Sequence, residues 1–353
     1  MMTEQLNDSY DVVVIGGGAA GLNGALMLAR ARRSVLVIDA GQPRNAPADG
    51  VHGLFAREGV PPSELLARGR EEVRGYGGHI IDGEVVAAHR GDRTAGPLAP
   101  AESPRHVATA DHESADASAG FTVALADGRT VRARRLLVTT GLVDELPEID
   151  GLKARWGRDA IHCPYCHGWE VRDRAIGVIG NGPMAIHLAL LFRQWSEDVV
   201  FFQHTMSPPT EEQAEQLAAR GIPVIAGAVS AVETEDDRLT GVRLADGTRF
   251  ARTALAVPTR MVARAGLLAG LGLHPVEHPS GAGEYIPAEA LTGKTEVPGV
   301  WAAGNVTDLS AQVGNAAAAG AMAGAHINAD LVSKETADAV AAYRAATEPV
   351  AVH

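Results

Sequence analysis

Cysteine, excess positive charge and long apolar runs are scarce or missing in this chain of 353 residues. Its two cysteines leave no framework of structural disulfides. The 31 basic side chains against 43 acidic ones give a net charge of −12, which argues against nucleic acids or anionic membranes as partners, because both bind basic patches. Residues 1–10 have neither the basic nor the apolar region of a signal peptide, so we expect no signal peptide and no membrane span.

Glycine and apolar residues are abundant. Hydrophobic residues make up 46% of the chain, charged residues 21%, and there are 40 glycines. This composition is typical of a soluble α/β protein rich in glycine and alanine. At about 150 residues for each domain, the length predicts two domains.

The two cysteines, Cys163 and Cys166, stand two residues apart. A bridge across so short a loop adds little stability, whereas this spacing lets one thiol attack and the other resolve the mixed disulfide. The alternatives are half of a zinc site, two unrelated buried thiols, or, with His167, a c-type haem attachment. Zinc would need a second ligand pair, which the chain lacks, so we predict redox chemistry and no metal site. A redox-active pair without structural disulfides fits the cytoplasm.

A nucleotide-binding unit opens the chain. An apolar run at residues 11–15 leads into Gly16-Gly17-Gly18-Ala19-Ala20-Gly21, then a helix over 22–33 and a strand over 34–38 that ends at Asp39. The glycines permit a tight turn and close approach of a pyrophosphate to the helix N-terminus, and the acid can accept a bond from a ribose hydroxyl. The strand, turn, helix and acid together predict a dinucleotide site.

A second unit of the same kind follows the cysteines. A strand over 175–179 precedes Gly180-Asn181-Gly182-Pro183-Met184-Ala185, a helix to about Trp195 and a strand over 199–202. The remaining expectations are a loop over 41–62, a surface insertion over 91–120, strands over 121–125 and 131–138, a buried strand over 300–306, an Ala-rich helix over 312–331, and a weakly helical or mobile tail from 333.

These motifs together resemble the low-molecular-weight thioredoxin reductase family, class II of the pyridine nucleotide-disulfide oxidoreductases. The matching pieces are the first glycine turn with its acid, Thr139-Thr140-Gly141, the cysteine pair, the second glycine turn, and Gly304-Asn305 before the Ala-rich helix. The resemblance implies an α/β fold of two Rossmann-like, three-layer ββα domains and a homodimer. It divides the chain into an FAD-binding domain (1–143 and 259–332), which is discontinuous in sequence, an NAD(P)-binding-like domain carrying the cysteines (144–258), and a tail (333–353).

The same resemblance implies which residues bind FAD. They are Gly16, Gly18, Ala19, Ala20, Gly21, Asp39, Ala40, Gln42, Thr140, Gly141, Gly304, Asn305, Gln312 and Val313. Asn305 stands where the family usually has aspartate, and an amide can still donate to a phosphate or ribityl oxygen.

The second nucleotide unit departs from the family. A 2′-phosphate requires Arg or Lys just after the second strand, and NADH requires Asp or Glu there. Residues 203–209 offer neither, and Pro183 removes one backbone N–H from the turn. We therefore expect NADPH not to bind, although His204 and more distant arginines could still serve.

The position after the second cysteine also departs from the family, because the reductases carry aspartate where this chain has His167. Both departures resemble the FAD-dependent dithiol oxidases of antibiotic-type biosynthesis, which close the disulfides of holomycin, gliotoxin and romidepsin. The resemblance implies that a small-molecule dithiol attacks Cys163, that Cys166 passes two electrons to FAD, that His167 takes the protons, and that O2 becomes H2O2. We expect the substrate to enter near Trp169 and the loop over 47–62, with His52 and Trp156 as candidate pocket residues.

Two other functions stay open from the sequence. One is an NAD(P)H- or ferredoxin-dependent thioredoxin-disulfide reductase. The other is a flavin-loaded redox sensor without turnover.

Overall fold

A computed structural model describes residues 6–91 and 120–347 of the chain. The predicted insertion over 91–120 therefore lies outside the described residues, apart from its two ends. The Gly91 N–H donates to the Gly120 carbonyl at 2.6 Å, so the insertion leaves and rejoins the fold at one point. No helix within the described ranges is long and apolar enough to cross a membrane.

The first domain is built on a seven-stranded sheet of order β3-β2-β1-β6-β5-β4, with β19 also pairing with β6. β1, β2, β3, β6 and β19 run parallel, whereas β4, β5 and β6 form an antiparallel meander. The strands are β1 (Ser9–Ile15), β2 (Val35–Asp39), β3 (His79–Asp82), β4 (Val85–Arg90), β5 (Phe121–Leu125), β6 (Thr130–Val138) and β19 (Val300–Ala302). The apolar runs read from the sequence form the central strands, where almost every residue is buried.

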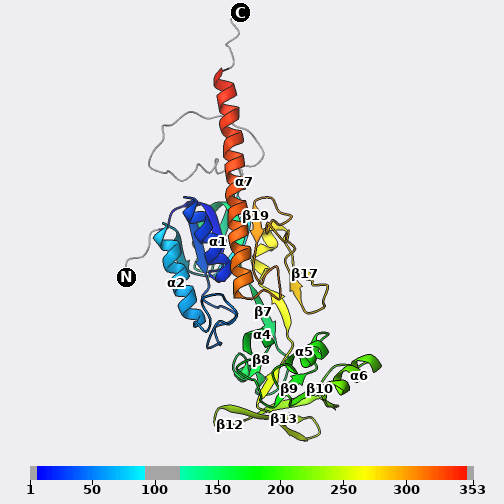
Figure 1. Ribbon diagram of the computed structural model, residues 1–353. Coiled ribbons are helices and arrows are strands. Elements are labelled where there is room, and N and C mark those ends of the chain that lie inside the picture. The colour runs from blue at the N-terminus through cyan, green and yellow to red at the C-terminus, as the bar shows by residue number, and fades with distance from the viewer. Residues whose placement is uncertain (1–5, 92–119, 348–353) are drawn as a thin grey trace, which may run out of the picture.

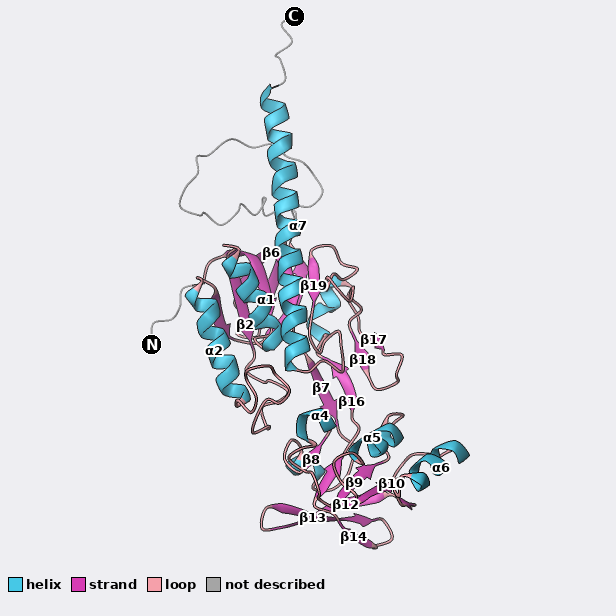
Figure 2. Cartoon of the chain, viewed as in Figure 1, coloured by secondary structure: helices cyan, strands magenta, loops and turns pink. Residues whose placement is uncertain are grey.

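Three helices cover one face of this sheet: α1 (Ala19–Arg30), α2 (Pro62–Gly75) and α7 (Val313–Thr347) (Figure 2). Glycines let α1 and α7 approach closely, because a Cβ on Gly320 would lie 1.9 Å from the Ala20 carbonyl oxygen. Ion pairs fix the middle of α7, with Arg33 and Arg134 both bonding Glu335. Beyond that point α7 projects away from the sheet (Figure 1).

The second domain has a parallel five-stranded sheet of order β11-β10-β9-β15-β8 and a separate antiparallel meander. The sheet strands are β8 (Ala160–Ile161), β9 (Ile176–Ile179), β10 (Val199–Phe202), β11 (Val224–Ile225) and β15 (Ala254–Ala256), and the meander is β12 (Val229–Glu235), β13 (Arg238–Leu244) and β14 (Arg249–Ala251). Its helices are α3 (Leu152–Arg155), α4 (Pro164–His167), α5 (Ala185–Phe192) and α6 (Glu211–Ala219). The sheet, its helices and the meander form three layers.

Two antiparallel strands carry the chain between the domains: β7 (Leu142–Glu145) leads out and β16 (Arg260–Ala263) leads back (Figure 1). The domain boundaries proposed from the sequence fall in β7 and immediately before β16. A short helix, η1 (Gly266–Leu271), and the hairpin of β17 (Val276–Glu277) and β18 (Glu284–Tyr285) complete the first domain.

The predicted two-domain α/β class is confirmed, and the predicted strands appear close to their expected positions. Three helices differ from expectation. The first, α1, spans Ala19–Arg30, three residues earlier at each end than the predicted 22–33. The helix after the second glycine turn ends at Phe192, short of Trp195, and the prediction that the Ala-rich helix ends near Leu331 was wrong, since α7 continues to Thr347. The ion pairs of Glu335 with Arg33 and Arg134 hold the middle turns of α7. The composition of the tail does not reveal these contacts. Residues 348–353 lie outside the described part of the chain.

We expect Gly320→Ala to reduce the free energy of unfolding of the first domain by about 1–3 kcal/mol, because the added methyl collides with backbone rather than with a movable side chain. Chemical denaturation of the purified protein measures this loss. Gly75→Ala is the matched control, since nothing lies within 4 Å of a Cβ at this helical position. It should be neutral or stabilising by up to about 1 kcal/mol, and an equal loss in both variants would contradict the role assigned to the α1–α7 contact.

Candidate active site

A cavity of about 1080 Å³ runs between the two domains. It extends from the first glycine turn, past the start of α7, to the cysteines on α4 and onward to α5. This volume exceeds the usual range for a single small-ligand pocket. The cavity can therefore hold a large cofactor and a second molecule.

The first glycine turn forms an open cradle at one end of the cavity. Gly16 has a φ of 108°, and a Cβ there would lie 2.4 Å from the Thr139 carbonyl oxygen. A Cβ on Gly17 would lie 2.7 Å from the Asp39 carboxylate, whereas nothing lies within 4 Å of one on Gly18. Gly18 caps α1 without a side-chain hydrogen bond. The first N–H groups of α1 are thus available to an anion in the cavity.

Thirteen of the fourteen residues predicted to bind FAD line this cavity: Gly16, Gly18, Ala19, Ala20, Asp39, Ala40, Gln42, Thr140, Gly141, Gly304, Asn305, Gln312 and Val313. The fourteenth, Gly21, is not among the lining residues. It packs under the turn, where a Cβ would lie 1.9 Å from the Gly16 carbonyl oxygen. The carboxylate of Asp39 is paired with Arg70 on α2, which also bonds Asp82.

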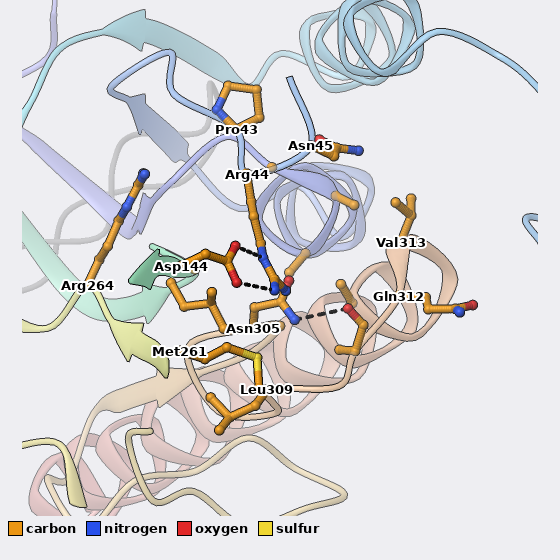
Figure 3. A pocket seen from close by; sticks show the side chains of 18 of the residues that line it. Pro43, Arg44, Asn45, Asp144, Met261, Arg264, Asn305, Leu309, Gln312 and Val313 are labelled. Atoms are coloured by element: carbon orange, nitrogen blue, oxygen red, sulfur yellow. Dashed lines mark hydrogen bonds and ion pairs between the residues drawn. The ribbon is translucent and has the colours of Figure 1, made fainter. Parts of the chain in front are cut away.

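Asn305 shapes the loop that leads into α7. Its Nδ2 donates to the carbonyls of Asp308 and Ala311 at 3.0 and 2.9 Å. The side chains of Gln312 and Val313 follow at the start of the helix (Figure 3). Thr140 Oγ1, across the cavity, is buried and has no hydrogen-bond partner among the described residues. A polar ligand in the cavity would satisfy such an atom.

Cys163 is the N-cap of α4 and Cys166 lies within the helix, and both are half-buried free thiols that line the cavity. Their Sγ atoms are 2.6 Å apart, so a small movement closes the pair to a disulfide. Gln312 Nε2 lies 4.0 and 3.9 Å from the two sulfurs. The predicted dithiol is thus next to the residues that begin α7.

The two thiols differ in acidity. The hydrogen bond accepted from Cys166 lowers the pKa of Cys163 to about 6, although burial acts in the opposite direction. Donating that bond raises the pKa of Cys166, and burial raises it further. In the reduced protein Cys163 is therefore the thiolate and Cys166 keeps its proton.

His167 presents an unpaired imidazole to the same cavity. Both ring nitrogens are buried and have no hydrogen-bond partner in the described part of the chain. Burial lowers the pKa of His167, and this effect outweighs the rise in pKa that the nearby Glu170 carboxylate causes. The ring is therefore neutral at neutral pH and able to accept a proton.

A buried ion pair that the sequence analysis missed lies beside the dithiol. Arg44 bonds both carboxylate oxygens of Asp144 at 2.7 Å, and Thr259 Oγ1 donates to the same carboxylate at 2.7 Å. Figure 3 shows Arg44 reaching across the pocket to Asp144, above Met261 and Leu309. Burial would raise the pKa of Asp144, but the bonds from Arg44 and Thr259 lower it overall. The two partners are a hundred residues apart, so no local motif could have indicated them.

The predicted entrance residues divide into two groups. His52 and Trp156 line the cavity, whereas Trp169 does not and instead stacks under Arg172. His52 bonds Glu58 in its own loop at 2.7 Å and lies 3.5 Å from Glu170 of the second domain. The loop from the first domain therefore reaches the segment that follows the cysteines.

The polar side chains after β10 are occupied within the second domain. His204 Nδ1 accepts the Val229 N–H at 3.1 Å, and Gln203 Nε2 donates to the Met206 carbonyl at 3.0 Å. Burial lowers the pKa of His204, so the ring stays uncharged at neutral pH. In the second glycine turn, Asn181 Nδ2 donates to the Pro258 carbonyl. These side chains offer no free cation or carboxylate at the end of β10.

The chain belongs to the pyridine nucleotide-disulphide oxidoreductase family, whose pattern matches residues 10–323. The crystal structure of HlmI is similar to it, with 44% identity and a TM-score of 0.85 over 98% of this chain and 99% of that one. An oxidoreductase from Agrobacterium tumefaciens is 34% identical, with a TM-score of 0.79 over 92% and 99% of the two chains. Thioredoxin reductase tcpT of Claviceps purpurea is 29% identical over 92% of this chain and 94% of its own. The predicted thioredoxin-reductase-like flavoprotein class is thereby confirmed.

Family membership implies a flavin cofactor, and the cavity fits one. The open cradle at Gly18 and the free N–H groups of α1 suit a phosphate group, and the orphan hydroxyl of Thr140 suits a polar ligand. The dithiol lies in the same cavity. The arrangement can therefore pass electrons between a thiol pair and a bound flavin.

We expect the reduced protein to be alkylated by iodoacetamide with a rate midpoint near pH 6, the pKa of Cys163. Cys166→Ala removes the donor that lowers this pKa, so the midpoint should move up by at least one pH unit. Cys166→Ser keeps a hydroxyl donor and should keep a low midpoint. Equal midpoints in the alanine and serine variants would show that the Cys166 bond does not set the acidity of Cys163.

Proposed function

We propose that this protein is an FAD-dependent dithiol oxidase that closes an intramolecular disulfide in a small-molecule dithiol and uses O2 as the electron acceptor, forming H2O2. The observation that carries the proposal is the neutral imidazole of His167, which has no hydrogen-bond partner among the described residues and shares one cavity with the Cys163–Cys166 pair and a dinucleotide cradle. Resemblance of the sequence to the dithiol oxidases supports the same assignment.

FAD is proposed because the cradle has the parts that an ADP group requires. The backbone of residues 16–20 would hold the pyrophosphate, and Asp39 would accept a bond from the adenosine ribose. Asn305, Gln312 and Val313 would lie along the ribityl chain and the ring. When bound, the flavin supplies a two-electron acceptor that dioxygen regenerates.

Dioxygen is proposed as the acceptor because the second domain is poorly equipped for NAD(P)H. Pro183 lacks the N–H that a pyrophosphate would use, and Gln203 and His204 are engaged in internal hydrogen bonds. Residues 203–209, which follow β10, include no Asp, Glu, Lys or Arg. A reductase of this family needs a group there to recognise the cofactor ribose.

In the first step His167 takes the proton of one substrate thiol, and the resulting thiolate attacks Sγ of Cys163 in the enzyme disulfide. A substrate–Cys163 disulfide forms while the bond from Cys163 to Cys166 breaks. Cys166 leaves and takes the proton that His167 accepted, because burial favours the neutral thiol, and the imidazole is again free to act as a base. The mixed disulfide then holds the substrate in the cavity.

In the second step the other substrate thiol loses its proton to His167 and attacks the substrate sulfur bound to Cys163. The product disulfide closes, and Cys163 leaves as a thiolate. A leaving thiol of low pKa departs faster, and the pKa of Cys163 is about 6. The substrate has lost two electrons and two protons, and the enzyme pair is reduced.

We further propose a cytoplasmic homodimer whose partners are the dithiol and O2, with no nucleic acid and no membrane. The thiol pair suits a reducing compartment. The apolar side chains of Val340 and Tyr343, exposed on the projecting part of α7, are compatible with a partner subunit (Figure 1). The net charge of −12 disfavours polyanions.

We expect anaerobic dithiothreitol to bleach the flavin absorbance of the purified holoprotein, and air to restore it with one H2O2 formed for each disulfide. NADPH and NADH alone should leave the absorbance unchanged, because the second domain offers them no ribose-recognising group. Prompt bleaching by NADPH would replace the oxidase with a reductase.

Cys166→Ser should retain the yellow cofactor and lose turnover, and full activity in this variant would refute the thiol relay.

We expect His167→Asn to slow bleaching by dithiothreitol on the order of a hundredfold near neutral pH, because the base is lost. In the wild type the rate should fall as pH drops through the lowered pKa of His167, since the protonated ring cannot accept. The variant should lack this inflection. His274→Asn, on an exposed residue outside the cavity lining, is the control, and stopped-flow absorbance against pH is the measurement. An unchanged profile in His167→Asn would remove His167 as the base.

A further inference from the structure

One face of α5 lines the cavity beyond the dithiol. Met184, which caps α5, and His187, Leu188 and Leu191 occupy positions i, i+3, i+4 and i+7, so they share one face of the helix, and all border the cavity. We call these four residues the α5 wall. Leu188 also packs into the core of the second domain, together with the intervening side chains of the helix: Ala185, Ile186, Ala189 and Phe192.

The α5 wall adjoins the helix that carries the cysteines. The Tyr165 ring on α4 packs edge-on against Trp195, just after α5, with centroids 5.8 Å apart. A Cβ on Gly168 would lie 2.8 Å from the Trp195 ring, so α4 and this end of α5 are tightly joined. Because Cys163 and the α5 wall line the same cavity, a molecule bound at Cys163 would have the α5 wall beside it.

A loop of the first domain forms another side of the same cavity. His278, Ser280 and Ala282, which we call the loop wall, border it. Ser280 and His278 are bonded to each other, with Oγ and Nδ1 2.8 Å apart. The two domains meet where a Cβ on Gly281 would lie 3.5 Å from Pro183 Cγ. The second glycine turn thus contacts the first domain.

The chemistry of these walls differs from that of the rest of the cavity. Elsewhere its lining includes Asp39, Arg44, Asp144 and Arg264. Neither the α5 wall nor the loop wall contains Asp, Glu, Lys or Arg. The α5 wall offers the exposed Met184 and half-buried Leu191, with the buried Leu188 behind them, and the exposed imidazole of His187.

We propose that the α5 wall selects the substrate, taking the apolar body of an uncharged dithiol while His187 hydrogen-bonds an amide of that substrate. The inference rests on the proposed oxidase function and adds the substrate class. A carboxylate would lose its hydration against these side chains without gaining a cation. The helix that follows a degenerate dinucleotide turn thereby serves recognition of a dithiol.

Two dithiols that differ in one group test this assignment. Dihydrolipoamide and dihydrolipoate share a 1,3-dithiol and an apolar chain, but the chain ends in an amide in one and a carboxylate in the other. With the FAD-loaded, full-length enzyme and H2O2 formation as the readout, we expect a KM for dihydrolipoamide on the order of tenfold below that for dihydrolipoate. Dithiothreitol, which has no apolar chain, is the reference substrate.

Substitutions on the wall separate recognition from chemistry. Leu191→Asp and His187→Ala should each raise the KM for dihydrolipoamide. This increase should be on the order of tenfold larger than the increase that the same variant causes in the KM for dithiothreitol. His187→Gln, which keeps a hydrogen-bonding side chain, should recover part of the loss. Gln194→Asp adds the same charge just after α5 and outside the cavity lining, and should change neither KM.

The outcomes distinguish the two proposals. If dithiothreitol and dihydrolipoamide both fail to reduce the wild-type enzyme, the oxidase function is overturned. If both are oxidised but the amide and the carboxylate give equal KM values, the substrate class is overturned while the oxidase stands. Equal shifts for dithiothreitol and dihydrolipoamide in Leu191→Asp and His187→Ala would likewise overturn the α5 wall.

Discussion

The position of the dithiol depends on one buried carboxylate, that of Asp144. This side chain lies on β7, receives two hydrogen bonds from Arg44 in the first domain, and receives a third from Thr259 immediately before β16. One acceptor thus ties both strands that connect the domains to the loop after β2. A bidentate, charge-assisted pair of this kind is strong when its remaining lone pairs are satisfied, and costly to break because it leaves a buried charge alone. The second domain, with Cys163 and Cys166, is held over the cavity by this contact and by that of Pro183 with Gly281.

The parts of the fold that could be predicted from the sequence are those whose signals are local. An apolar run, three glycines and an acid predict β1, α1 and β2, because each signal acts within a few residues. The true end of α7 could not be predicted in this way. Its middle turns are held by the ion pairs of Arg33 and Arg134 with Glu335, and these arginines lie 302 and 201 residues earlier in the sequence. Tertiary contacts of this kind override the composition of the helix itself.

The candidate site divides along the same line. Spacing indicated the cysteine pair and the glycine cradle, since their chemistry depends on neighbouring residues, whereas the role of His167 came from the resemblance to the dithiol oxidases. The separate acidities of Cys163 and Cys166 could not be read from spacing, because they depend on the hydrogen bond between the two sulfurs and on burial. Arg44 and Asp144 are ordinary charged residues in the sequence, and only the fold brings them together. The role proposed for the α5 wall likewise depends on the cavity beside it, which only the fold reveals.

The chain enters the second domain through β7 and returns through β16, so that domain is one uninterrupted insert (Figure 1). The thiols and the α5 wall lie on the insert, whereas the glycine cradle and the start of α7 lie on the flanking segments. Evolution can therefore exchange or redesign the insert as a cassette. Asp144 at the start of the insert and Thr259 immediately after its end form, with Arg44, the contact that joins both ends to the platform. Such modularity lets one electron-accepting platform acquire new thiol chemistries without rebuilding its own binding groove.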